Sequence, residues 1–254
     1  MSKKKWIILA AGVIALGLMA MVLALVLLFG LLSGNGESAV ASGLPVYTFE
    51  QSASSHAGYR HTTLTRGNEV YVSDYEEAAL ELINPEPSTV IGVIVPMGVS
   101  KVCSIPGQPE TAYIAADCGG EMPAYAPFRN IKQPPFDWRT AIFREMKAYG
   151  PNKSSPNLTT TDPALMAEVV RVLRDGVPVE LPGFTFAQIP SIPCLKMASD
   201  QLPSLLFCPS VFTDASGQIY LAESLMIDAT STPPQVHARW IPASPKLAQW
   251  LKGP

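Results

Sequence analysis

The sequence predicts an α+β protein, in which one transmembrane helix precedes a mixed, largely antiparallel sheet domain with three to four short helices. Three observations lead to this prediction. Residues 6–32 contain no charged side chain. Short apolar stretches of the kind found in strands recur through the rest of the chain. Segments with helix-capping residues and helical spacing of apolar side chains lie between these strands.

The uncharged run at the N-terminus favours a retained membrane anchor. It has 27 residues, whereas a bilayer core needs about 20 and a signal-peptide core has about 7 to 15. Three lysines at positions 3–5 precede the run, and the positive-inside rule places them in the cytoplasm. We therefore expect a cytoplasmic tail at 1–5, a lipid-contacting span at 6–32, a linker at 33–43 and an extracytoplasmic domain, periplasmic or extracellular, at 44–254.

A signal that is cut off is the competing interpretation. Ala39-Val40-Ala41 followed by Ser42 has the small-x-small form of a signal-peptidase site. Cleavage after Ala41 would turn a membrane-held subunit into a secreted one. The apolar run, roughly twice the usual signal core, favours the anchor instead.

The charge of the outer part restricts its partners. After residue 36 the chain has 15 basic and 21 acidic residues, a net charge of −6. Such a balance argues against nucleic-acid binding, which normally needs a basic patch, and against docking on anionic lipid headgroups. All 24 prolines also lie in this part, which predicts short strands and extended connections.

The four cysteines, Cys103, Cys118, Cys194 and Cys208, fall on the side predicted to be oxidising, where disulfides form. Four cysteines allow three pairings. We favour Cys103–Cys118 and Cys194–Cys208, because each pair closes a loop of about 15 residues, for which chain entropy gives about 3 kcal/mol. The rival zinc interpretation lacks the two- to four-residue ligand spacing of structural sites, and the sequence has no C-x-x-C redox motif.

Strands are expected wherever β-branched and aromatic residues alternate or cluster between turn residues. The expected strands lie at 44–49, 88–96 and 235–241, with hairpins at 59–72 (turn at Gly67-Asn68), 100–118 and 204–225 (turn at 214–217). Helices are expected at 75–84 after Asp74, at 137–150 after Asp137, at 162–176 after Asp162 and at 246–252 after Ser244-Pro245.

Within the second of these helices, Trp138, Ile142, Met146 and Tyr149 would share one face. Each half of the domain has a capped helix followed by strands and one cysteine pair. We therefore also consider two similar α+β halves, divided near 130–160.

No motif in the sequence assigns an activity. A nucleophile elbow, an H-E-x-x-H pair, a phosphate loop and a dinucleotide fingerprint are all missing. His56, His61 and His237 are neither spaced as metal ligands nor close in sequence to the cysteines. Asn152 and Asn157 begin glycosylation sequons. We therefore assign no catalytic, metal or cofactor residue and expect a protein that is not an enzyme.

The leading functional hypothesis is a single-pass, membrane-anchored interaction protein, an accessory or structural subunit of a membrane-associated complex. Its partner would be another membrane protein or a second copy of the chain. One alternative is an extracytoplasmic ligand-sensing or solute-binding module, with Trp138, Tyr149, Tyr220 and Trp240 as candidate pocket residues. The second alternative is a cell-envelope hydrolase with an unrecognised site.

Overall fold

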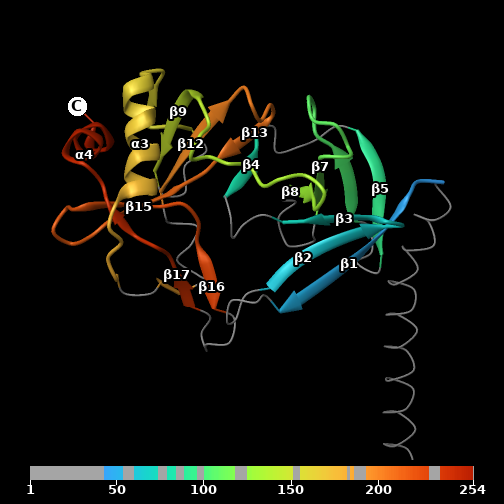
Figure 1. Cartoon of the computed structure of the whole chain (residues 1–254). Helices are drawn as coiled ribbons and strands as arrows, with labels where there is room; N and C mark the ends of the chain where they lie inside the picture. Colours follow the sequence, from blue (N-terminus) through green and yellow to red (C-terminus); the bar gives the residue numbers. More distant parts are fainter. Residues whose placement is uncertain are drawn as a thin grey trace, which may run out of the picture.

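The computed structural model describes residues 43–53, 60–73, 79–83, 89–95, 100–117, 125–150, 155–181, 184–185, 193–228 and 235–253. This part of the chain forms a closed β-barrel beside a larger open sheet and two helices (Figure 1). No helix within these ranges is long and apolar enough to cross a membrane. The predicted tail, span and most of the linker lie outside the described residues.

Seven strands close the barrel, and the closure is a parallel pair between β1 and β5. All other neighbours in the barrel are antiparallel. The predicted hairpins at 59–72 and 100–118 are confirmed as strand pairs β2–β3 and β6–β7. In barrel order the strands are β1 (Val46–Ala53), β2 (Arg60–Arg66), β3 (Glu69–Val72), β8 (Tyr125–Asn130), β7 (Tyr113–Asp117), β6 (Lys101–Ser104) and β5 (Val90–Val95).

The barrel interior is filled by large apolar side chains from alternate strand positions. Its buried members are Tyr47, Leu64, Tyr71, Ile94, Val102, Ile114, Ala116 and Phe128. The rings of Tyr47 and Tyr71 meet edge to face, with 6.2 Å between centroids. The interior is therefore a packed core.

The second, larger sheet is antiparallel throughout. One of its strands, β4, comes from the part of the sequence that otherwise forms the barrel. Its main path runs β10 (Leu158–Thr160), β9 (Phe143–Tyr149), β12 (Cys194–Ser199), β14 (Ser210–Thr213), β15 (Ile219–Ala222) and β18 (Ile241–Pro242). A side branch pairs β12 with β13 (Leu205–Phe207), and β13 with β4 (Leu80–Leu82). The β14–β15 hairpin confirms the predicted turn at 214–217.

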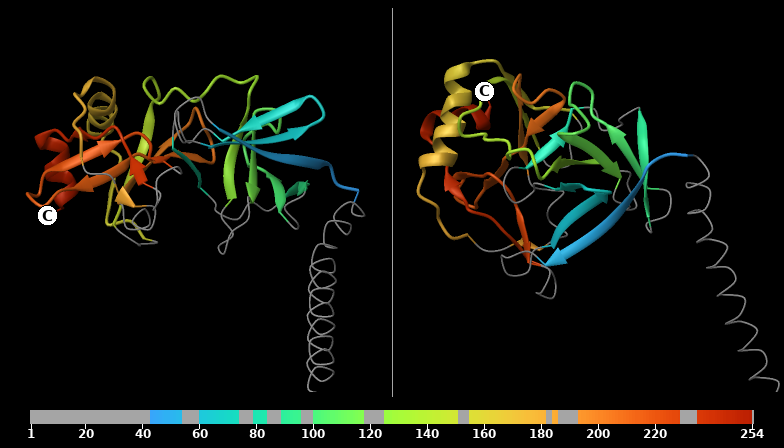
Figure 2. Two further views of the ribbon diagram at one scale, coloured as in Figure 1. Left: turned by 90° about the horizontal axis from the view of Figure 1, so that it is seen from below. Right: turned by 45° about the vertical axis from the view of Figure 1, so that its right-hand side comes forward.

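A small third sheet contains β11 (Phe184–Thr185), β17 (Gln235–His237) and β16 (Met226–Asp228). Figure 2 shows the same division from two further sides, with the helices and the barrel at opposite ends of the molecule. One hydrophobic core nevertheless joins the two parts, because barrel residues pack with residues of the larger sheet. From the barrel strands, the shared core contains Cys103, Tyr113 and Ala115, and Ile105 joins them just after β6.

Two helices, α3 (Pro163–Asp175) and α4 (Pro245–Lys252), confirm the predictions at 162–176 and 246–252. The Asp162 carboxylate accepts the N–H of Ala164 at 2.9 Å, and the Ser244 hydroxyl caps α4. The face of α3 that packs on the sheet carries Leu165, Met166, Val169, Val170, Val172 and Leu173.

Gly176 ends α3 with an ordinary negative φ, so its role is one of space rather than of a left-handed turn. A Cβ at this position would collide with the Ile241 side chain and the Val172 carbonyl. The glycine therefore lets the end of α3 approach β18 closely.

An ion pair on the surface of α3 also contacts the start of α4. Arg171 donates two hydrogen bonds to the Glu168 carboxylate, at 2.8 and 2.6 Å. These bonds, together with one from Ser244 at the start of α4, lower the pKa of Glu168 to about 2. The carboxylate is thus charged in the folded protein at every pH above that value.

We expect Glu168→Gln to lower the free energy of unfolding by about 1 kcal/mol at pH 7, a value reduced for solvent screening of the pair. Because the folded pKa is depressed, the contribution is complete above the unfolded pKa of about 4.3 and is lost as the pH falls toward 2. Urea unfolding at pH 7, 4 and 2.5 measures this. The control is Asp175→Asn at the exposed Arg174–Asp175 pair. A difference from wild type that does not depend on pH would contradict the assignment.

The helix predicted at 137–150 is wrong. Residues Phe143–Tyr149 form strand β9, which pairs with β12 on one side and β10 on the other. Pairing along the whole strand outweighs the helical spacing of apolar residues. Asp137 does act as a cap, but for a single turn, since its carboxylate accepts from the Arg139 N–H and the Thr140 hydroxyl. Ile142, expected on the buried face, is 78% exposed.

The helix predicted at 75–84 is also wrong where it can be compared. Residues 74–78 lie outside the described residues, and Leu80–Leu82 is strand β4. The described part is therefore mainly β, with two helices instead of three to four. The closed barrel and the open sheet differ in topology, which contradicts the hypothesis of two similar halves.

The strand expected at 235–241 is interrupted. Gln235–His237 belongs to the small sheet as β17, and Ile241–Pro242 belongs to the larger sheet as β18. The chain therefore passes from one sheet to the other within this stretch.

Candidate functional site

The first candidate site is a run of three exposed apolar residues directly after α3: Val177, Pro178 and Val179. The Val177 side chain is 78% exposed and that of Val179 is 37% exposed. A run of consecutive exposed apolar residues is a candidate contact surface. We call this run the VPV segment.

The VPV segment is attached to the fold at Val179. The Val179 N–H donates to the Trp240 carbonyl at 2.8 Å, which adds the segment as a bridge beside β18. Trp240 itself is 2% exposed, so the bridge is tied to the core. Pro178 has no N–H, which limits further strand pairing at this position.

The second candidate site is a group of ionisable side chains on one face of the larger sheet: Glu81, Cys194, Lys196 and Cys208, here called the Cys–Lys cluster. Lys196 Nζ lies 2.5 Å from Glu81 Oε2 and 4.9 Å from the centre of the Tyr149 ring. Because side chains alternate along a strand, Cys194 and Lys196 project from the same face of β12. The intervening Leu195 belongs to the hydrophobic core.

The electrostatics of the Cys–Lys cluster keep its thiols protonated. Burial, assisted by the charge of Glu81, raises the pKa of Cys194 to about 11. The same two causes raise the pKa of the Cys208 thiol well above its usual value. Burial alone would lower the pKa of Lys196, but the hydrogen bond and charge of Glu81 outweigh it and raise that pKa.

Such a cluster is not prepared for nucleophilic catalysis. A nucleophilic cysteine needs a lowered pKa, and a nucleophilic lysine must lose its proton near neutral pH. Both requirements fail here because desolvation and the Glu81 carboxylate act against them. The cluster can instead provide two adjacent thiols and a fixed ion pair.

Of the two predicted disulfide pairs, the structure describes both cysteines of only one. Cys118 lies outside the described residues, so the Cys103–Cys118 pairing stays a prediction; Cys103 is buried in β6. Cys194 and Cys208 are both described and are free thiols, placed near each other by β12, β13 and β14.

The other residues singled out from the sequence do not come together. Trp138 and Trp240 are buried in the core, whereas the Tyr220 hydroxyl donates to Asp214 at the β14–β15 turn. His237 is exposed, and the side chains of His56 and His61 lie outside what the structure describes. Asn157, which begins one sequon, is exposed just before β10, and Asn152 is not among the described residues. No group of potential metal ligands is found within the described ranges.

Sequence reasoning missed the Glu81–Lys196 ion pair. Glu81 falls within the helix predicted at 75–84, and no strand was predicted over Cys194–Ser199. The alternation of Cys194, Lys196 and Ala198 with Leu195 and Met197 was a usable signal for that strand. The pairing with Glu81 had no local signal, because β4 and β12 come from different halves of the sequence.

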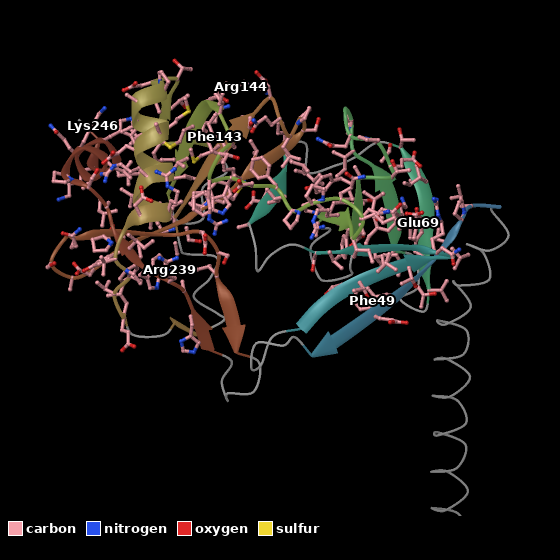
Figure 3. The ribbon with its side chains drawn as sticks, viewed as in Figure 1. Phe49, Glu69, Phe143, Arg144, Arg239 and Lys246 are labelled. Carbon is pink, nitrogen blue, oxygen red and sulfur yellow. The ribbon has the colours of Figure 1, made fainter. Side chains whose placement is uncertain are left out.

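The sequence does not mark the VPV segment either, because the exposure of three apolar residues depends on the whole fold. Figure 3 shows how the labelled side chains are distributed, with Phe143 and Arg144 on β9 and Glu69 on the barrel.

Searches for similar proteins give no family to guide either site. No protein-family model matches the chain, and neither the curated proteins nor the solved structures contain a significant match.

Proposed function

We propose that the chain is a single-pass membrane protein whose outer domain is an accessory or structural subunit of a membrane-associated complex. The VPV segment is its contact with a neighbouring membrane-held protein. The observation that carries this proposal is the exposure of Val177, Pro178 and Val179 beside β18.

The length of the linker supports a partner in the same membrane. If residues 6–32 span the bilayer, the linker at 33–43 reaches at most roughly 40 Å. Strand β1 begins at Val46 and pairs at once with Val93 of β5, so the tether ends in a fixed part of the barrel. A domain held this way works close to the bilayer and meets other membrane-held proteins at high effective concentration.

The test uses a photo-crosslinking amino acid at position 177 of the full-length chain in its own membranes. We expect an adduct with one membrane protein, and we expect the additional change Val179→Asp to reduce that adduct at least tenfold. The matched control places the crosslinker at Ile142, an aliphatic residue that is also 78% exposed.

The possible results separate clearly. An adduct from position 177 that the control position does not form, and that Val179→Asp suppresses, supports the docking role. An adduct with twice the mass of the chain would replace the proposed partner with a second copy. Equal adducts from both positions, or none from either, would contradict a contact at the VPV segment.

A further inference from the structure

A row of uncharged side chains crosses the barrel wall at the end where β1 begins. Thr48 of β1 lies opposite Thr65 of β2, and Thr65 lies opposite Val70 of β3. Ile131, directly after β8, continues the row, because its N–H donates to the Val70 carbonyl at 3.0 Å. Directly opposite residues of antiparallel strands place their side chains on the same face, so this row forms one continuous strip.

The strip faces outward. The neighbours of its members along β1, β2 and β3 fill the barrel interior: Tyr47, Leu64 and Tyr71. Because side chains alternate along a strand, the strip lies on the outside of the barrel. Val46, two residues before Thr48, lies on the same outer face and is 41% exposed, and Ile131 is 52% exposed. We call this outer surface the barrel patch: Val46, Thr48, Thr65, Val70 and Ile131.

The charges around the barrel patch stay at its borders. On one side Lys132 Nζ lies 2.9 Å from Glu69 Oε1, so the two charges compensate each other. On the other side is Glu50, which is exposed two residues beyond Thr48 on β1. The barrel patch therefore fits an uncharged or zwitterionic surface. This agrees with the acidic balance of the outer part, which argues against docking on anionic lipid headgroups.

The position of the tether indicates what such a surface meets. Strand β1 begins at Val46, inside the barrel patch. If residues 6–32 span the bilayer, a flexible linker at 33–43 has an average end-to-end distance of about 18 Å. Figure 3 shows Glu69, at the border of the barrel patch, at the same end of the barrel as the start of β1. Phospholipid headgroups are therefore the partner that this surface meets at the highest effective concentration.

We propose that the barrel patch rests on the headgroup layer of the bilayer and so sets the orientation of the outer domain. This inference rests on the proposed membrane anchor. The valine and isoleucine side chains enter the boundary between headgroups and acyl chains, and the threonine hydroxyls donate to lipid phosphate or ester oxygens. The backbone groups of these strands are paired within a closed barrel, so no open sheet edge meets the lipid.

The test places a fluorescent amino acid at position 131 of the full-length chain, reconstituted in phosphatidylcholine vesicles in which some headgroups carry a nitroxide quencher. The matched control places it at Ile142, an aliphatic residue that is 78% exposed. Ile142 directly precedes β9, whose labelled residues Phe143 and Arg144 lie far from Glu69 in Figure 3. We expect quenching at 131 to be at least about three times that at 142, because docked apolar side chains sink about 5–10 Å into the headgroup layer.

Two changes test the chemistry of the contact. Val46→Asp should lower the quenching at 131 to the level of position 142, because a carboxylate in the barrel patch would have to be desolvated. Replacing about a third of the lipid with phosphatidylglycerol should leave the wild-type ratio unchanged. A large increase with phosphatidylglycerol would overturn the uncharged contact. The comparison of positions 131 and 142 does not depend on the folding of the Val46→Asp variant.

Extraction of the same vesicles with alkaline carbonate separates this inference from the proposed function. Retention of the chain together with equal quenching at 131 and 142 would overturn the resting contact and leave the anchor in place. Release of the chain would show that the anchor is wrong, and the proposed function and this inference would both fail. Retention with the expected difference between the two positions supports the inference.

Discussion

Replacing Trp138 with alanine is expected to lower the free energy of unfolding by about 4 kcal/mol, the largest effect we expect from one substitution. The Trp138 side chain is fully buried in the turn before β9. Its ring stacks on Phe207 of β13 at 5.3 Å, nearly parallel, and the Arg139 guanidinium covers it at 4.5 Å. Truncation would leave a large cavity between these groups.

The melting temperature of the full-length chain, followed by circular dichroism, should fall by about 8–16 °C. Trp138→Phe provides the control, because it keeps an aromatic ring against Phe207. It also removes the indole N–H, which is buried and has no hydrogen-bond partner among the described residues. We expect a loss of only about 1 kcal/mol for this variant, since an unpaired buried donor is itself unfavourable. Equal losses of unfolding free energy for alanine and phenylalanine would show that an aromatic ring at position 138 does not provide the stabilisation.

Replacing Gly92 with valine is expected to cost at least about 3 kcal/mol, at the upper end of the overpacking range. A Cβ at Gly92 would collide with the Tyr47 ring and would lie 2.8 Å from the Pro45 carbonyl oxygen. That same carbonyl accepts the Val93 N–H at 3.0 Å. The substitution therefore acts on the parallel β1–β5 pair, which is the closure of the barrel.

Gly217→Ala is the matched control for this substitution. Its added methyl group would meet no atom within 4 Å, and only its positive φ of 83° disfavours it. We expect a loss of about 1 kcal/mol there, from the backbone alone. Urea unfolding of both variants measures the difference. A Gly92→Val loss no greater than that of Gly217→Ala would mean that β1 can move away without opening the barrel.

Local signals in the sequence were sufficient for the elements that depend on local chemistry. The caps at Asp162 and Ser244 predicted both helices, and turn residues predicted three hairpins. Each of these features is decided within a few residues of the chain.

The prediction of a helix at 137–150 was wrong because the conformation of this segment depends on pairing with distant strands. Its apolar spacing fits a helix, but β12 and β10 offer it partners along its whole length. The barrel closure and the Glu81–Lys196 pair are equally non-local, since β1 must meet β5 and β4 must reach β13. No periodicity in a single segment contains that information. The exposure of the VPV segment likewise depends on where Trp240 comes to lie.

The position of β4 also has a consequence for the order of folding. Its partner β13 comes from the other half of the sequence, so β4 leaves the ribosome long before β13 is made. At about 5–20 residues per second, the wait is on the order of ten seconds. During that time a strand edge from the barrel region stays open to wrong partners. Because β4 and the shared core join the two parts only after β13 is made, we expect the barrel region to reach its final packing only once the later strands are complete.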